Sequence, residues 1–231
     1  MGEPVKPFLL LRADDLDAQR PHGEIDDVHF TEALAESVLA DTTAPGDVVL
    51  DPFAGYGTTL VVAERMERTA IGVELLPDHV DLVRSRTAGL AVVLQGDSRD
   101  LATVVADVLD GPVDLVLTSP PYMSRMAHPE NPLTGYATDD GNYPTYLEEL
   151  GLVFAQVAEL LRSGGQAVVN VANVVSHHDG ADGSYDLVTP LAWDIGRVVS
   201  QHLRFEGETF LCWDRHPPGL AGDYLLWFRK P

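Results

Sequence analysis

Two stretches of the sequence carry residue types whose spacing suits nucleotide binding and the chemistry built on it. In the first, the apolar run 48–50 ends in the carboxylate of Asp51 and leads to Gly55, Gly57 and a second apolar-periodic run. Strand, tight glycine turn and helix in this order open a nucleotide-binding βαβ unit. Glycines let the backbone approach a ligand without a Cβ in the way. Thr58 and Thr59 stand where a helix presents free N–H groups.

Polar side chains end each of the four predicted strands that follow one another along the chain. Asp51 ends the first, and Glu74 ends an apolar strand about 20 residues after the glycines. Asp97 follows the strand at 91–95, and Ser119 follows the strand at 114–117. In open α/β sheets the ligand crevice lies at the carboxyl ends of the strands, near the point where strand order reverses. The residues alone therefore predict that these side chains share one site.

The two stretches together resemble a known family. The pattern D-P-F-x-G-x-G-T-T at 51–59, followed by T-S-P-P-Y at 118–122, is similar to the S-adenosylmethionine-dependent amino-methyltransferases that methylate exocyclic amines of DNA bases. The S-P-P-Y form is similar to the cytosine-N4 branch, whereas the adenine-N6 branch more often carries Asp in place of the Ser. The resemblance covers roughly residue 28 to the C-terminus. It implies a Rossmann-like α/β fold of class I: a mostly parallel seven-stranded sheet, helices on both faces and a C-terminal antiparallel hairpin.

The resemblance also implies S-adenosyl-L-methionine as the cofactor. Glu74 would accept hydrogen bonds from ribose hydroxyls, Asp97 would bind the adenine amino group, and Phe30 would touch the methionine part. Two alternatives stay open, because Phe30 could be plain core and Asp97 could cap the helix predicted at 102–109. The expected cofactor contacts are Phe30, Asp51, Pro52, Phe53, Ala54, Gly55, Gly57, Thr58, Thr59, Glu74, Asp97, Ser98 and Thr118.

The S-P-P-Y turn is the expected catalytic element. An exocyclic amine is a poor nucleophile because its lone pair is delocalised into the ring. Ser119 Oγ and the Pro120 carbonyl could accept its hydrogens and localise that lone pair, and the prolines fix the direction of the carbonyl. Tyr122 offers an aromatic face to the target ring. The expected catalytic residues are Ser119, Pro120, Pro121 and Tyr122, and the expected substrate contacts are Tyr122, Tyr136, Asn142 and Tyr143, the last three in a long loop that could form a lid.

The charge of the chain complicates the choice of substrate. Asp and Glu outnumber Lys and Arg by 36 to 15, for a formal net charge of −21, and no basic run stands anywhere. DNA binding draws on basic residues, and members acting on DNA usually carry a target-recognition segment, of which no block is visible. The resemblance implies nucleic acid, with DNA first, as the partner, whereas the acidic charge speaks against it. The alternative substrate is RNA, a nucleoside or another small aromatic amine. The alternative function is that of a cofactor-binding regulator without turnover. An NAD-dependent enzyme is disfavoured, because the G-x-G lacks the third glycine at the usual spacing.

Composition and the remaining segments suggest one domain without a metal. We expect an N-terminal arm at 1–27, partly ordered, and a single methyltransferase domain at 28–231. The polar stretch 176–185 reads as a loop, and its His177-His178-Asp179 lacks a further ligand at helical spacing, so no metal is expected. One Cys excludes an internal disulfide, and the apolar cluster at 8–11 is too short for a signal sequence, so a cytoplasmic location is expected. The sequence leaves the oligomeric state open.

Overall fold

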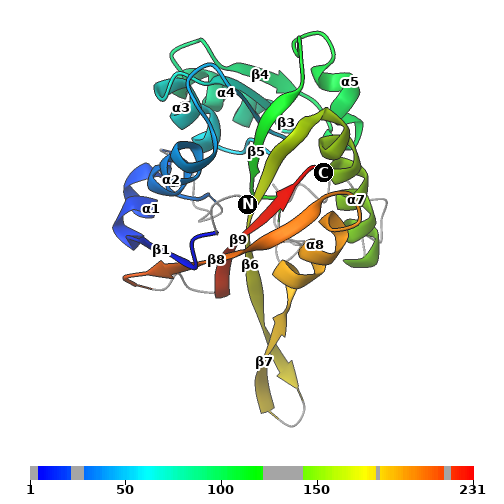
Figure 1. Ribbon diagram of the computed structural model, residues 1–231. Coiled ribbons are helices and arrows are strands. Elements are labelled where there is room, and N and C mark those ends of the chain that lie inside the picture. The colour runs from blue at the N-terminus through cyan, green and yellow to red at the C-terminus, as the bar shows by residue number, and fades with distance from the viewer. Residues whose placement is uncertain (1–4, 22–28, 122–142, 181–182, 216–219) are drawn as a thin grey trace.

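A single twisted sheet lies between two layers of helices in the computed structural model, which describes residues 5–21, 29–121, 143–180, 183–215 and 220–231 (Figure 1). The elements are β1 (Phe8–Leu11), α1 (Ala13–Gln19), α2 (Glu32–Thr42), β2 (Val48–Asp51), α3 (Thr58–Arg65), β3 (Thr69–Glu74), α4 (Pro77–Arg86), β4 (Val92–Gln95), the 3₁₀ helix η1 (Ser98–Asp100), α5 (Leu101–Val105), β5 (Val113–Thr118), α7 (Tyr143–Leu160), β6 (Leu161–Gly180), β7 (Gly183–Thr189), α8 (Leu191–Val199), β8 (Arg204–Trp213) and β9 (Leu220–Arg229).

The strand order is β1-β8-β9-β6-β5-β2-β3-β4, with β7 paired to β6 off this path. The strands from β4 through β3, β2 and β5 to β6 are parallel, and β9 inserts antiparallel between β6 and β8. The predicted class, a mostly parallel sheet with a C-terminal antiparallel hairpin, is confirmed. Within the described residues the sheet has nine strands rather than seven, because β1 adds parallel to β8 and β7 extends the sheet beside β6.

The order of the strands reverses at β2. This strand pairs with β3 on one side and with β5 on the other, so the chain moves outward from β2 to β4 and then returns to the middle at β5. The carboxyl ends of β2 and β5 therefore border the crevice where open α/β sheets bind ligands. Both stretches singled out in the sequence begin at these two ends.

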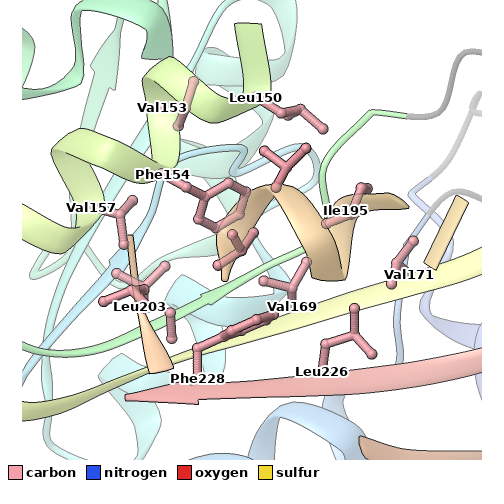
Figure 2. Packing of buried hydrophobic residues seen from close by; sticks show 14 of the residues in the cluster. Leu150, Val153, Phe154, Val157, Val169, Val171, Ile195, Leu203, Leu226 and Phe228 are labelled. Atoms are coloured by element: carbon pink, nitrogen blue, oxygen red, sulfur yellow. The ribbon is translucent and has the colours of Figure 1, made fainter. Parts of the chain in front are cut away.

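Two apolar clusters, one on each face, hold the helices to the sheet. Buried residues of α5, α7 and α8 share one cluster, in which Phe154 packs near Phe228 and Val169 (Figure 2). Buried residues of α2, α3 and α4 share the other, together with Leu117 and Val168. Parallel strands covered on both faces read as near-continuous apolar runs, which is the pattern of 113–117 and 167–169.

The helix starts follow from local chemistry. The hydroxyl of Thr31 accepts the backbone N–H of Leu34 at 3.3 Å, and α2 begins at the next residue. Pro77 occupies the first turn of α4, where its missing N–H costs nothing. Among the described residues, no helix is both long enough and apolar enough to cross a membrane.

Two segments differ from expectation. Residues 8–11 and 13–19 form β1 and α1, where the sequence shows no clear periodicity, because pairing with β8 supplies backbone hydrogen bonds that a local pattern does not reveal. The stretch 176–185 is not simply a loop, since 176–180 and 183–185 pair antiparallel in a hairpin that projects from the body (Figure 1). The domain division at residue 27 stays a prediction.

Candidate functional site

A glycine turn joins β2 to α3. Gly55 and Gly57 have φ of 52° and 80°, in the left-handed region that favours glycine. A Cβ on Gly57 would lie 2.5 Å from Cγ1 of Val83, so the turn packs directly on α4. The N–H of Gly57 donates to Ala54 at 2.7 Å, and the N–H of Ala54 donates to Val73 at 3.0 Å, which ties the turn to β3.

Glu74 anchors the same turn from the end of β3. Its Oε2 accepts the N–H of Gly55 at 2.8 Å, and its Oε1 accepts the N–H of Leu76 at 2.8 Å. The side chain is buried, and burial raises the pKa of this carboxyl, an effect that the backbone donors and His79 oppose. His79 Nδ1 lies 4.0 Å from Oε1. Each carboxylate oxygen keeps a lone pair beyond its backbone bond, so Glu74 can still accept hydroxyl groups at the crevice.

Asp51 lies at the centre of the site, at the end of β2. It is 2% exposed, and its Oδ1 accepts the N–H of Phe53 at 3.0 Å and the hydroxyl of Thr118 at 2.6 Å. Burial raises the pKa of Asp51 to about 6, although the hydrogen bonds from Thr118 and Phe53 favour the charged form. A carboxyl group whose pKa is shifted toward neutral pH is typical of functional sites.

The two stretches singled out in the sequence are neighbours in space. Beyond the bond from Thr118 to Asp51, the hydroxyl of Thr59 donates to the carbonyl of Leu117 at 3.3 Å. Thr58, which begins α3, is buried beside Thr59 at the start of that helix. The glycine turn and the S-P-P-Y turn therefore emerge from the same edge of the sheet, as the strand-end argument predicts.

The third strand end is organised by Arg99. Asp97 caps η1 by accepting the N–H of Arg99 at 2.9 Å, and the guanidinium of Arg99 lies 2.6 Å from its Oδ2. Arg99 also pairs with Glu149 of α7 at 2.7 Å, and its hydrogen bonds hold the pKa of Asp97 below the usual value. Ser98 donates its hydroxyl to the carbonyl of Pro52. Asp97 is thus a cap, of η1 rather than of a helix at 102–109, and a contact with adenine stays a prediction.

Pro121, the last described residue of the S-P-P-Y stretch, contacts α7. Tyr146 is 3% exposed and donates its hydroxyl to the carbonyl of Pro121 at 2.8 Å. Tyr143 stacks on Tyr146 with ring centroids 6.1 Å apart, and its own hydroxyl donates to Asp194 of α8 at 2.8 Å. Burial and the neighbouring carboxylate raise the pKa of Tyr143. Pro120 is buried and Ser119 is partly exposed at the crevice.

The remaining predicted contacts are either in the apolar core or outside the described residues. Phe30 is 7% exposed and packs in the apolar cluster of α2 to α4, as the core alternative has it, and its contact with a cofactor stays a prediction. Tyr122, Tyr136 and Asn142 lie outside the described residues. Tyr146 is absent from the predicted site, because its spacing marks it only as a residue of the apolar face of α7. A small hollow beside the turn is lined by Arg99, Pro121, Tyr146, Glu149, Leu150 and Val153.

The topology and the placement of the site define a Rossmann-like class I methyltransferase fold. TrmN from Thermus thermophilus superposes with a TM-score of 0.59 at 16% identity, covering 87% of this chain and 49% of that one. The glycopeptide N-methyltransferase MtfA, in a complex with S-adenosyl-L-homocysteine, superposes with a TM-score of 0.56 at 14% identity, covering 94% of this chain and 95% of that one. At these identities the likeness concerns the fold.

Sequence comparison narrows the class over the N-terminal part of the chain. A family model described as DNA methylase matches residues 16–85, from α1 to α4. The Type II methyltransferase M.Cfr9I from Citrobacter freundii is 40% identical over 76 residues, a match that covers 33% of this chain and 23% of that protein. The resemblance to the DNA amino-methyltransferases is confirmed, and the matched part contains the glycine turn, Asp51 and Glu74.

Proposed function

We propose that this chain is an S-adenosylmethionine-dependent N-methyltransferase that methylates an exocyclic amine of a nucleobase in DNA. The observation that carries the proposal is the junction of the two turns, where Thr118 donates to Asp51 directly before Ser119 and the two prolines. A nucleotide-binding turn and a turn of amine acceptors thus share one crevice. The family match and the methyltransferase fold support the same reaction.

The residues present fit the cofactor. Glu74 is buried with one backbone N–H on each oxygen, which orients its free lone pairs toward paired hydroxyls such as those of ribose. A Cβ added to Gly55 would meet only the carbonyl oxygen of Phe53, at 3.9 Å, so this glycine leaves room for close approach of a ligand to the backbone. When bound, the cofactor supplies an electrophilic methyl group on a sulfonium.

The chain itself contributes positioning and hydrogen-bond acceptors. Ser119 Oγ and the Pro120 carbonyl accept the hydrogens of the target amine, which localises its lone pair. Tyr146 holds the following carbonyl, that of Pro121, so the turn keeps one shape. Orientation of two reactants can lower a barrier by up to about 7–11 kcal/mol. No strong base is needed, because the amine proton becomes acidic once the methyl group is transferred.

Cytosine N4 is the target that the sequence favours. Ser119 stands where the adenine-N6 branch more often has Asp, and the S-P-P-Y form is similar to the cytosine-N4 branch. Nucleoside analysis of DNA methylated by the protein decides the point: N4-methylcytosine supports the assignment, and N6-methyladenine contradicts it.

Transfer of labelled methyl groups to DNA, RNA and free nucleosides tests the substrate class. Label on DNA supports the proposal. Label on RNA or nucleosides alone supports the second candidate, a small-substrate or RNA N-methyltransferase, which the net charge of −21 favours. The match spans less than a quarter of the curated relative, so a recognition function of that protein does not transfer with it.

Two variants separate the proposed roles within the site. Ser119→Ala is expected to lower the transfer rate at least tenfold with cofactor affinity nearly kept, because its hydroxyl faces the amine. Glu74→Gln is expected to weaken cofactor binding about ten- to a hundredfold, since it removes a charged acceptor worth roughly 1.5–3 kcal/mol. Calorimetric titration of the cofactor and the transfer assay measure the two properties. Equal loss of both in both variants contradicts this division of roles.

A further inference from the structure

A buried polar cluster spans three strands beside the candidate site. Asn170 on β6 and Asp223 on β9 are 6% and 7% exposed, and Trp213 on β8 lies with them. Asn170 Nδ2 donates to Asp223 Oδ1 at 2.9 Å, and Trp213 Nε1 donates to Asp223 Oδ2 at 3.1 Å. Buried polar groups destabilise a core unless they are satisfied, and these two hydrogen bonds satisfy Asp223 on both of its carboxylate oxygens.

The cluster fixes which way the amide of Asn170 points. Its second hydrogen is donated to the carbonyl of Tyr224 at 3.2 Å, so both amide hydrogens face acceptors on β9. An amide turned over would set its oxygen against a carboxylate and a carbonyl, which excludes that orientation. Oδ1 is therefore directed away from β9, and among the described residues no donor to it is recorded.

The register of the sheet sets Asn170 next to the S-P-P-Y turn. The last registered pair of β5 and β6 joins Thr118 to Val169, so Asn170 lies one position further, level with Ser119. Side chains alternate along a strand, and Asn170 therefore shares the face of Val168. On that face Val168 packs in the cluster that also contains Leu117 and Phe30. Oδ1 is thus an oriented acceptor at the carboxyl edge of β5, on the side of the sheet where α2 begins.

We propose that Asn170 Oδ1 accepts a hydrogen bond from an amine in the bound reactants, and that Asp223 and Trp213 hold the amide in that orientation. This inference rests on the proposed function and adds an acceptor to Ser119 and Pro120. Two amines have the required chemistry: the exocyclic amine of the target, and the α-ammonium group of the cofactor. Asn170 contacts the reactants, whereas Asp223 and Trp213 are positioning residues.

Variants of Asn170 and a matched control test the proposal. Asn170→Ala removes the acceptor. Thr209→Val is the control, because Thr209 is 1% exposed on β8 and accepts Trp227 Nε1 at 2.9 Å, a cross-strand polar pair outside the proposed site. Each variant loses two hydrogen bonds of a buried side chain, since Thr209 also donates to the carbonyl of Lys6 at 2.6 Å, so both are expected to unfold at a lower temperature than the wild type. Only Asn170→Ala is expected to alter binding or transfer.

The readouts distinguish the two amines. Titration calorimetry uses S-adenosylhomocysteine, which carries the α-ammonium group, and 5′-methylthioadenosine, which lacks it. If Oδ1 binds the cofactor, Asn170→Ala weakens the affinity for S-adenosylhomocysteine at least tenfold and leaves the affinity for 5′-methylthioadenosine unchanged. If Oδ1 binds the target amine, both affinities persist and the transfer rate falls at least tenfold. Either result supports the proposal.

Other outcomes overturn it. An Asn170→Ala protein with unchanged affinities and rate, destabilised like Thr209→Val, shows that the amide is only structural. An equal loss of affinity for both probes also shows that the amide is only structural. Should Asn170→Ala fail to fold, Asp223→Asn is the deciding variant, because it allows the amide of Asn170 to turn over. A loss of affinity or of transfer rate in one of the two patterns described above supports the proposal. Unaltered binding and transfer refute it. A wild-type protein that binds neither probe and transfers no methyl group overturns the proposed function, and this inference with it.

Discussion

Asp51 keeps a carboxyl group where an amide would suit the fold better. Its folded pKa of about 6 lies above the ordinary value of 3.8, because burial disfavours the charged form. The folded state therefore binds more protons than the unfolded state between these values, and stability falls as pH rises through that window. Above pH 6 the ionised group lowers the free energy of unfolding by up to about 3 kcal/mol. The charged form of Asp51 thus opposes folding at neutral pH, and we propose that this carboxylate takes part in cofactor binding.

Asp51→Asn is accordingly expected to raise the free energy of unfolding at pH 8 by up to about 3 kcal/mol. The amide oxygen can still accept from Phe53 and Thr118, while the charge is gone. Denaturant unfolding of the variant and the wild type at several pH values measures the difference. Near pH 4 the wild-type carboxyl is protonated, so the gain should vanish there. A gain that is equal at pH 4 and pH 8, or a loss at pH 8, would contradict the assignment.

At the scale of the elements, α7 contacts the S-P-P-Y stretch through the hydroxyl of Tyr146. Tyr146→Phe removes the bond to the Pro121 carbonyl, which is expected to lower the unfolding free energy by about 0.5–1.5 kcal/mol and to slow methyl transfer several-fold without weakening cofactor binding. Tyr143→Phe compares the neighbour in the same ring stack, which donates to Asp194 instead. Transfer assays on both variants and the wild type check this. A Tyr146→Phe protein that transfers methyl groups at the wild-type rate would remove Tyr146 from any role in positioning the turn.

The glycine turn makes a prediction about its contact with α4. Gly57→Ala combines a left-handed φ with a Cβ 2.5 Å from Val83, so we expect a loss of roughly 2–4 kcal/mol of unfolding free energy from strain and overpacking. Gly55→Ala has the left-handed φ but only a 3.9 Å contact, so about 1–2 kcal/mol is expected. Denaturant midpoints of the two variants compare them. The same loss for both would show that α4 yields to the added methyl group.

The sequence predicts elements where the signal is local, and fails where it is not. The strand ends at Asp51 and Glu74 follow from apolar runs and glycine spacing, and the structure places these two residues at the carboxyl ends of β2 and β3. β1 and β7 escape prediction because their strand pairing depends on residues of β8 and β6. Tyr146 escapes for a similar reason, since a buried tyrosine on an apolar helix face looks like core until its hydroxyl is seen to meet Pro121. Long-range hydrogen bonds carry no local pattern.

For the molecule as a whole, the net charge determines how the protein can bind a polyanion such as DNA. The net charge is −21, and most arginines whose partners are recorded face carboxylates, as Arg65, Arg162 and Arg229 do. Few cations are thus available to replace the counterions of DNA phosphates. An acidic protein of this kind and a DNA duplex repel each other at low ionic strength, and added salt screens that repulsion.

Methylation of DNA by this chain is therefore expected to depend on salt in an unusual way. DNA-binding proteins that contact 6–10 phosphates lose roughly 10³–10⁵ in affinity between 50 and 200 mM salt. Here we expect kcat/KM on DNA to stay within about threefold, or to rise, over that range, because the release of counterions is nearly balanced by the screening of repulsion. Initial rates at fixed cofactor and varied KCl measure it, with a free nucleoside as the uncharged control. A steep fall of kcat/KM with salt on DNA alone would contradict this expectation. It would show that the protein binds DNA through a local basic surface despite its overall negative charge.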